Sequence, residues 1–141
     1  MPQPSNADLQ AVVALLAALP NPVKLSFYTQ SIGCEMCLPA KQALDQLVSL
    51  GEKLTLEELN VVLDKDRAAA AGIDRAPAVV LETSGDTRIR FLGAPLGYEM
   101  ASLVEAIRLA SEGDSGLAPE SRALVAQVAQ PIRIEVYTTP T

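Results

Sequence analysis

Two cysteines, Cys34 and Cys37, are the side chains of this sequence best suited to covalent chemistry. They are the only cysteines in the chain and stand three positions apart, in the segment Gly33-Cys34-Glu35-Met36-Cys37. In a reducing compartment, disulfides are usually transient and serve catalysis or redox sensing. A Cys-x-x-Cys motif between a strand and a helix is typical of such redox chemistry. We therefore predict a redox-active disulfide in residues 33–37, called the CxxC motif below.

The predicted elements on either side place this motif at a strand-to-helix turn. Residues 23–29 alternate apolar and weakly polar side chains, which indicates a strand covered on both faces, and residues 40–50 have the apolar spacing of a helix. Unpaired N–H groups and the helix dipole at a helix start lower the pKa of a thiol, which predicts Cys34 as the nucleophile. Cys37, one turn inside the helix, is expected to be less exposed and to resolve the mixed disulfide.

Three neighbours of the cysteines are predicted to contact the substrate. Gly33 allows a partner's backbone to approach closely, and Met36 offers a deformable apolar surface. Glu35 has two opposing effects, because its charge is favourable near a helix N-terminus but raises the pKa of a neighbouring thiol. Pro39 removes a backbone donor near the helix start, so a kink is expected just past the cysteines.

A second part of the site is predicted around Pro77. A proline has no N–H for a strand ladder, so Pro77 belongs at the start of the strand over 78–82, and a cis Ala76–Pro77 peptide would explain this placement. The backbone groups of Ala76 are then open to an extended substrate segment. Gly93, after the returning strand, is also assigned to substrate binding. Arg75 either stabilises the nucleophilic thiolate or is a solvated surface charge.

Glu57 and Glu58 are further candidates, because they lie in a predicted strand over 54–61. In one interpretation, one of these carboxylates accepts the proton of Cys37. In the other, both lie on the surface, as most glutamates do.

Composition argues against several other kinds of function. The chain has a net charge of −6 and no histidine. A negative chain without a basic stripe is unsuited to nucleic acid, and Cys–His sites, Ser–His–Asp sites and histidine-ligated metals all need the missing residue. A metal or iron–sulfur site remains as an alternative, but it would need ligands from a second chain or from glutathione, because two cysteines do not fill four positions. No cofactor is therefore expected.

The apolar run over 11–19 has two interpretations. Its length suits a signal peptide, but Asp8 precedes it and no lysine or arginine occurs before Lys24. Its residues also have helical spacing, which predicts an amphipathic helix that is capped by Ser5 or Asn6 and reaches the end of the run. No apolar run approaches the ~20 residues needed to cross a bilayer. We expect a cytoplasmic protein without a membrane partner.

The order of the predicted elements indicates an α/β fold. After the first helix come a strand, a helix and a strand, then a short helix over 65–71, a hairpin of strands over 78–82 and 87–92, and a helix that ends near 112. The helix between the first two strands is long enough for a right-handed crossover, so these strands are expected to be parallel. Together the elements predict a thioredoxin-like fold over residues 1–112, with a four-stranded mixed sheet flanked by helices.

The C-terminal part of the sequence repeats its beginning. Residues 113–118 form a linker, Pro119 starts a predicted helix, and an alternating strand follows over 131–138. Shifting the start of the chain by 109 positions superimposes a helix, a proline, an alternating strand and a Tyr-Thr pair on this segment. We predict that residues 113–141 comprise a linker, a helix and the first strand of an incomplete second thioredoxin-fold unit. Alternatively, this helix and strand belong to a single domain.

The strand of that second unit has no predicted neighbour. An unpaired strand exposes backbone groups that favour pairing with another strand. We therefore expect residues 131–141 to be disordered or to pair with an edge strand of the same or another chain, and a homodimer is one such assembly.

Several segments resemble the protein disulfide oxidoreductases, glutaredoxin-like proteins built from two tandem thioredoxin folds. The resemblance implies that Cys34 is the nucleophile, Cys37 the resolving thiol and Pro77 the cis-proline. It also implies a second Cys-x-x-Cys after Thr141, which this sequence does not reach. The matching segments are Cys34-Glu35-Met36-Cys37, Ile73-Asp74-Arg75-Ala76-Pro77-Ala78, Arg90-Phe91-Leu92-Gly93-Ala94-Pro95-Leu96-Gly97 and Tyr137-Thr138-Thr139-Pro140-Thr141.

The expected function is thiol–disulfide exchange with protein substrates through Cys34 and Cys37, an oxidoreductase role in cell redox homeostasis. Expected partners are protein thiols or disulfides and a thioredoxin-reductase-like flavoprotein as electron donor. The alternative is a redox-inactive module for docking or electron relay, as in the N-terminal region of alkyl hydroperoxide reductase flavoproteins. The N-terminal unit of those proteins typically lacks a working cysteine pair, so the intact pair favours the oxidoreductase.

Overall fold

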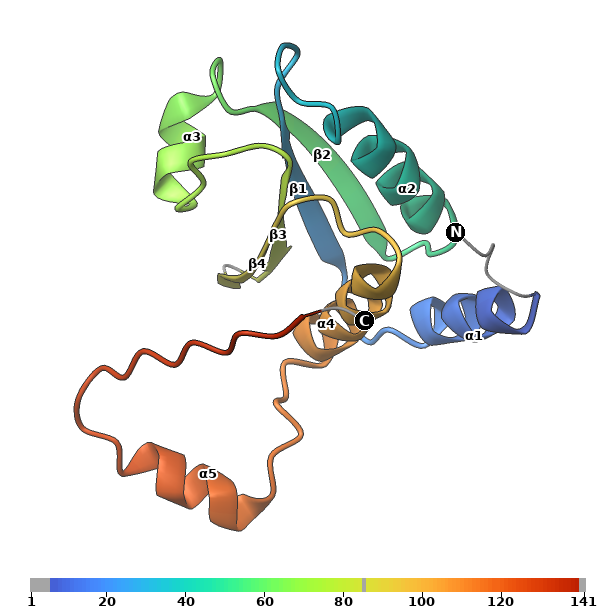
Figure 1. Cartoon of the computed structure of the whole chain (residues 1–141). Coiled ribbons are helices and arrows are strands. Elements are labelled where there is room, and N and C mark those ends of the chain that lie inside the picture. The colour runs from blue at the N-terminus through green and yellow to red at the C-terminus, as the bar shows by residue number, and fades with distance from the viewer. Residues whose placement is uncertain (1–5, 85, 140–141) are drawn as a thin grey trace.

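A four-stranded mixed sheet with helices on both faces forms the core of the computed structural model, which describes residues 6–84 and 86–139 (Figure 1). The predicted α/β class is confirmed, and so is the order of the elements from the first helix to the one that ends at Glu112. The elements are α1 (Asn6–Ala17), β1 (Val23–Thr29), α2 (Cys37–Ser49), β2 (Leu54–Asn60), α3 (Lys65–Ala70), β3 (Ala78–Thr83), β4 (Asp86–Leu92), α4 (Tyr98–Glu112) and α5 (Pro119–Ala126).

β1 is central in the strand order β2-β1-β3-β4. It pairs with β2 in parallel, from Val23 opposite Leu54 to Thr29 opposite Asn60, which confirms the predicted crossover. It pairs with β3 antiparallel, with Tyr28 opposite Ala78. The end of β1, the end of β2 and the beginning of β3 therefore meet at one edge of the sheet. The CxxC motif follows β1 at this edge.

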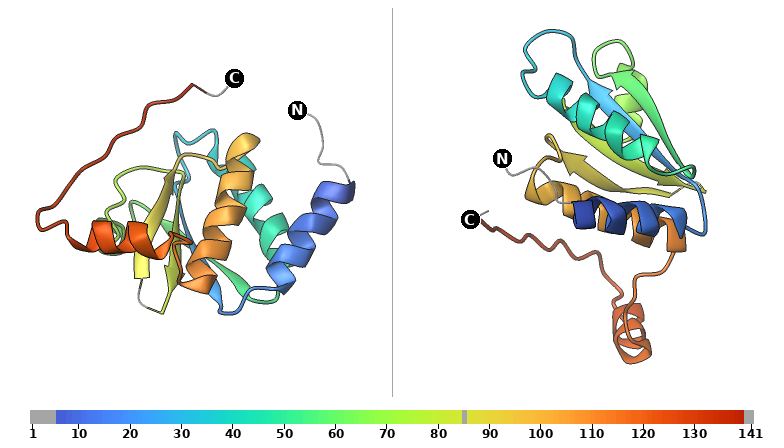
Figure 2. Two further views of the ribbon diagram at one scale, coloured as in Figure 1. Left: turned by 90° about the horizontal axis from the view of Figure 1, so that it is seen from below. Right: turned by 90° about the vertical axis from the view of Figure 1, so that its right-hand side faces the viewer.

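The two faces of the sheet are covered unequally. α1, α2 and α4 lie on one face and α3 on the other (Figure 2). The larger core contains Leu25 and Phe27 of β1, and the smaller core under α3 contains Tyr28 of the same strand. Alternate residues of β1 thus serve opposite cores, as expected of a strand buried on both faces.

The first helix is shorter than predicted and its apolar face is narrower. α1 ends at Ala17, two residues before Leu19. Leu16 and Leu19 are buried, whereas the side chains of Leu9 and Val13 are 42% and 39% exposed. Only the C-terminal half of the helix therefore contributes to the core. Ser5, the alternative cap, lies outside the described residues.

The C-terminal segment has a helix where one was predicted but no strand. α5 begins at Pro119 and has no buried residue. Residues 131–139 are extended and exposed, and they join no strand of the sheet (Figures 1 and 2). The alternating pattern of this segment is present, but a strand also needs a partner for its backbone groups.

A polar clip joins the end of α4 to the α1–β1 connection, and the sequence patterns did not indicate it. Ser111 is buried, and its Oγ accepts a hydrogen bond from the Asn21 N–H (3.0 Å) and donates one to the Asn21 carbonyl (2.6 Å). Asn21 Nδ2 also donates to the Ser111 carbonyl (2.8 Å). The clip fixes the last turn of α4 beside the chain that enters the central strand.

We expect Ser111→Ala to destabilise the protein by about 1–3 kcal/mol, because it leaves backbone groups of Asn21 without their partner in a poorly solvated place. The free energy of unfolding in urea measures the effect. Ser102→Ala, at an exposed position of the same helix, is the matched control and should change stability by no more than about 0.5 kcal/mol. Equal effects of both substitutions would contradict the role of the clip.

Candidate active site

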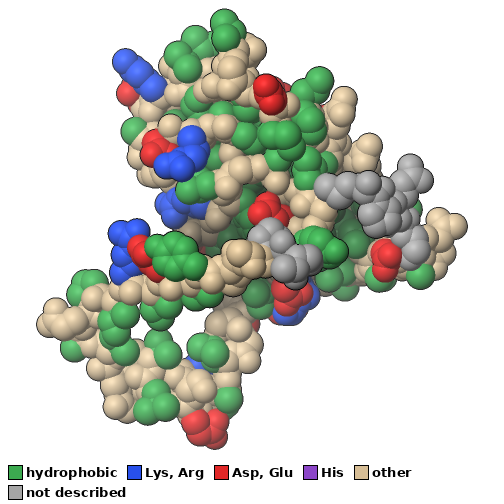
Figure 3. Space-filling model, in the orientation of Figure 1, with side chains coloured by type: hydrophobic (Ala, Val, Ile, Leu, Met, Phe, Trp, Pro, Cys, Tyr) green, Lys and Arg blue, Asp and Glu red, His purple; other side chains and the backbone are tan. Residues whose placement is uncertain are grey.

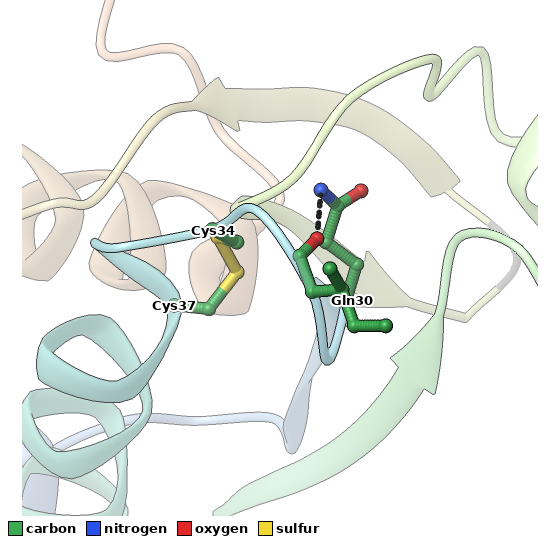
Figure 4. Close-up of a disulfide and its surroundings, with 4 residues drawn as sticks. Gln30, Cys34 and Cys37 are labelled. Carbon is green, nitrogen blue, oxygen red and sulfur yellow. Dashed lines mark hydrogen bonds between the residues drawn. A yellow bond between two sulfur atoms is a disulfide. The ribbon is translucent and has the colours of Figure 1, made fainter.

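The two cysteines form a disulfide at the edge of the sheet where β1 ends (Figure 4). Their Cα atoms are 5.4 Å apart, and the Cys37 N–H donates to the Cys34 carbonyl (3.3 Å). Cys37 is 5% exposed, whereas Cys34 is only half-buried. Cys34 is therefore the more accessible residue of the two, and the predicted difference in exposure is present.

The start of the second helix differs from the prediction. α2 begins at Cys37, so Cys34 lies in the turn before the helix and not at its first position. Pro39 explains the shift, because it has no N–H to donate to the Glu35 carbonyl, and the first regular bond runs from the Ala40 N–H to the Met36 carbonyl (3.0 Å). The kink at Pro39 stays a prediction; the donor that this proline lacks falls in the first turn of α2, where N–H groups have no helical partner.

The loop before Cys34 depends on Gly33. Its φ of +74° lies in the left-handed region, and a Cβ at this position would meet only Gln30 Nε2, at 3.7 Å. The requirement for glycine is therefore conformational, in addition to the predicted close approach of a partner. Gln30 closes the loop by donating from Nε2 to the Ile32 carbonyl (2.8 Å; Figure 4). Sequence reasoning missed Gln30, because a polar residue in a loop gives no distinctive pattern.

Residues of the CxxC motif and the Ala76–Pro77 peptide line one pocket of about 340 Å³. The peptide bond is cis, as predicted, and Pro77 is buried. Two separate segments, predicted independently from a cysteine spacing and a proline position, thus face each other. The lining residues are Gly33, Cys34, Glu35, Met36, Ala76 and Pro77.

Two residues assigned to substrate binding do not line this pocket. Gly93 donates its N–H to the Pro77 carbonyl (2.8 Å), so it supports the proline from the neighbouring connection. Arg75 is 63% exposed at its side chain and forms a two-point ion pair with Asp74, through Nε to Oδ1 (2.8 Å) and Nη2 to Oδ2 (3.2 Å). The guanidinium lowers the pKa of the Asp74 carboxyl by donating hydrogen bonds to its ionised form. Of the two interpretations of Arg75, the solvated surface charge agrees with this structure.

Glu57 is engaged on the α3 face of the sheet, away from the face that α2 covers. Its carboxylate accepts two hydrogen bonds from Arg67 (2.6 and 3.1 Å) and one from Lys24 (3.0 Å). The hydrogen bonds from Arg67 and then Lys24 lower the pKa of Glu57 from 4.5 to about 2. A carboxylate held ionised by two cations on this face is not placed to accept the proton of Cys37.

Glu58 points to the other face, where its carboxylate lies 3.7 Å from Lys41 Nζ of α2. Its side chain is 51% exposed, and its contact is with this lysine. Surface placement, the second of the two interpretations, therefore describes both glutamates.

The described residues contain no group of three or more histidine, cysteine, aspartate or glutamate side chains that could hold a metal ion. Among the helices of residues 6–84 and 86–139, none has the length and apolar character to cross a bilayer.

Several solved structures are similar to this chain. A protein disulfide oxidoreductase from Aeropyrum pernix K1 superposes with a TM-score of 0.77 at 23% identity, over 91% of this chain and 56% of that one. The N-terminal domain of the alkylhydroperoxide reductase AhpF from Enterococcus faecalis gives 0.76 at 26% identity, over 86% of this chain and 59% of that one. A thioredoxin from Halobacterium salinarum gives 0.53 at 21% identity, over 82% and 89%.

These comparisons show that the chain contains a thioredoxin-like fold with a Cys-x-x-Cys pair. The chain spans a little over half the length of the first two structures, at 56% and 59%. No protein-family model and no curated protein sequence matches it.

The pairing of Glu57 predicts a pH dependence of stability. A carboxyl whose pKa is lower in the folded than in the unfolded state stabilises the fold above the unfolded value, and this contribution is lost as the pH falls through the folded value. Between about pH 4.5 and pH 2, wild-type protein should therefore lose more stability than Glu57→Gln. Urea unfolding across this range measures the difference. Glu120→Gln, on the exposed α5, should follow the wild-type profile, and a wild-type profile for Glu57→Gln would contradict the assignment.

Proposed function

We propose that this chain is a thiol–disulfide oxidoreductase of the glutaredoxin and thioredoxin type, acting on protein thiols or disulfides. The observation that carries the proposal is the disulfide between a half-buried Cys34 and a buried Cys37, in a pocket completed by the cis Ala76–Pro77 peptide. The similarity to a disulfide oxidoreductase structure supports the same chemistry.

In the reducing direction, the Cys34 thiolate attacks one sulfur of a partner disulfide. The partner's S–S bond breaks, its second sulfur leaves as a thiolate that takes up a proton, and a mixed disulfide forms. Cys37, after losing its proton to solvent, attacks the Cys34 sulfur and releases the partner's first sulfur as a thiolate, which is protonated in turn. Two electrons pass from the dithiol to the partner, and the Cys34–Cys37 disulfide is the oxidised product. A dithiol reductant restores the dithiol by the reverse sequence.

Ala76 supplies the means to hold the partner in place. Neither its N–H nor its carbonyl has a hydrogen-bond partner among the residues that the structure describes, although the residue borders the pocket. An extended segment beside Cys34 can form backbone hydrogen bonds with these groups, as in strand addition. Met36, 46% exposed, adds an apolar contact that adapts to different partners.

A second candidate, a docking or electron-relay module, is favoured by the similarity to the alkylhydroperoxide reductase AhpF, at 26% identity. In that function the chain would pass electrons between partners or only bind them.

A thioredoxin-reductase-like flavoprotein is the proposed electron donor in the first function, and a cytoplasmic location is proposed for both.

Substitution of the two cysteines distinguishes these functions. Cys34→Ser should abolish dithiol-dependent reduction of insulin, because the nucleophile is lost. Cys37→Ser should accumulate a mixed disulfide with the substrate, because the resolving thiol is lost. Turbidity of reduced insulin and mass spectrometry of the trapped adduct are the measurements.

Retention of insulin reduction in Cys34→Ser would refute the oxidoreductase. Partner binding that is unchanged in the double Cys→Ser variant, in a protein without reductase activity, would establish the docking module instead.

We further propose that residues 1–112 are one thioredoxin-fold unit and that 113–141 begin a second, incomplete one. The exposed α5, the unpaired extended segment and the 56% coverage of the disulfide oxidoreductase support this division. Hydrophobic side chains lie exposed along α5 and the segment after it (Figure 3). The same apolar residues would serve the proposed homodimer, with 131–139 added to an edge strand of a second copy.

Limited proteolysis of the full chain tests the division. Thermolysin should cut first within 113–139 and leave a fragment ending near residue 112 that keeps its activity toward insulin. Fragment masses and residual activity are the readouts. Unfolding or inactivation on the first cut would contradict the two-unit assignment, and protection of 131–139 that is lost on dilution would indicate pairing between two copies.

A further inference from the structure

Glu35 is the only charged residue among those that line the pocket of the CxxC motif. It is exposed, and the structure shows no ion pair or hydrogen bond of its side chain with another described residue. The remaining lining comes from the cysteine and from uncharged residues: Gly33, Cys34, Met36, Ala76 and Pro77. The charge that a partner meets beside Cys34 is therefore that of one uncompensated carboxylate.

Other carboxylates near this edge of the sheet already form ion pairs with basic side chains. Asp74 holds Arg75, and Glu58 lies beside Lys41. Lys41 also forms a closer ion pair with Asp45 (2.6 Å). The cations nearest to the motif in the sequence are thus engaged with their own partners, and a new cation binding to Glu35 displaces none of these pairs.

The position of Glu35 links it to the partner's reacting cysteine. It follows Cys34 directly and shares the pocket with Ala76, whose free backbone groups can align an extended segment. Consider a substrate segment that is bound at Ala76 and has its disulfide beside Cys34. The residues next to the substrate's own cysteine then lie close to Glu35. A lysine or arginine there is attracted to the carboxylate, and a glutamate or aspartate is repelled.

We propose that Glu35 is a specificity-determining residue that selects disulfides flanked by a lysine or arginine. This inference rests on the proposed oxidoreductase function and adds the substrate class to it. The chemistry is unchanged: the Cys34 thiolate forms the mixed disulfide, the partner's other sulfur leaves as a thiolate, and Cys37 completes the two-electron reduction. Glu35 acts on the encounter and alignment that precede the attack.

Three peptides that share one intramolecular disulfide test the proposal. They differ only in the residue next to the first cysteine, which is lysine, glutamine or glutamate. Reduction of each peptide by the full-length dithiol protein is followed at low salt, and kcat/KM for the lysine peptide is divided by kcat/KM for the glutamate peptide. Because a flanking lysine also changes the peptide's own reactivity, the informative quantity is the change of this ratio between protein variants.

We expect the ratio to fall about three- to tenfold from wild type to Glu35→Gln. In wild type, Glu35 attracts the lysine peptide and repels the glutamate peptide, and each effect has the size of an exposed ion pair. Glu35→Gln removes both effects. Glu35→Lys should invert the preference. The wild-type preference should decrease as salt rises to ~0.5 M, because exposed charges are screened. Glu52→Gln, at the exposed turn before β2 and at the opposite edge of the sheet, is the matched control and should keep the wild-type ratio.

Any general effect of Glu35 on the reactivity of Cys34 changes kcat/KM of both peptides by the same factor. It therefore cancels when one kcat/KM is divided by the other. Equal ratios in wild type and Glu35→Gln, with all peptides reduced, would overturn the specificity role and leave the oxidoreductase intact. Failure of the wild-type dithiol to reduce any of the peptides or insulin would overturn both. An unchanged far-ultraviolet spectrum and unfolding midpoint confirm that each variant is folded.

Discussion

β1 is hydrogen-bonded to strands on both sides and buried on both faces, and the site depends on this double pairing. A parallel neighbour on one side brings the end of β2 to the edge where β1 ends, and an antiparallel neighbour on the other brings the beginning of β3 to the same edge. Two segments far apart in the sequence, the CxxC motif and the Ala76–Pro77 peptide, therefore meet in one pocket. A shift in the register of β1 by one residue would exchange the two cores and move the cysteines away from the proline.

The charges of the molecule have two different arrangements. On the α3 face, four side chains neutralise one another across the sheet: Lys24, Glu57, Arg67 and Glu82. In the pocket, Glu35 has no such partner among the lining residues. Pairing on the sheet serves the fold, whereas an uncompensated charge at the entrance to a reactive sulfur affects which molecules approach it.

The fold and the centre of the site were predictable from the sequence because the signals were local. The alternation over 23–29, the spacing of Cys34 and Cys37, and a proline before a strand each identify a backbone constraint within a few residues. The start of α2, the pairing of Glu57 and the Ser111 clip were not predictable, because each depends on residues from other elements or on which carbonyl has a donor. The predicted C-terminal strand shows the same limit, since alternation indicates a capacity for pairing but supplies no partner.

The late start of α2 has a kinetic consequence. Cys37 is the first helical residue and is held by the packing of α2 on the sheet, whereas Cys34 belongs to the turn before it. In the proposed exchange, a covalently attached partner would therefore be held on the turn, while the Cys37 sulfur stays at the start of the packed helix. In that exchange, the effective concentration of the Cys37 sulfur at the mixed disulfide depends on its fixed place at the start of α2, whereas the partner contributes through the pKa of its leaving thiol.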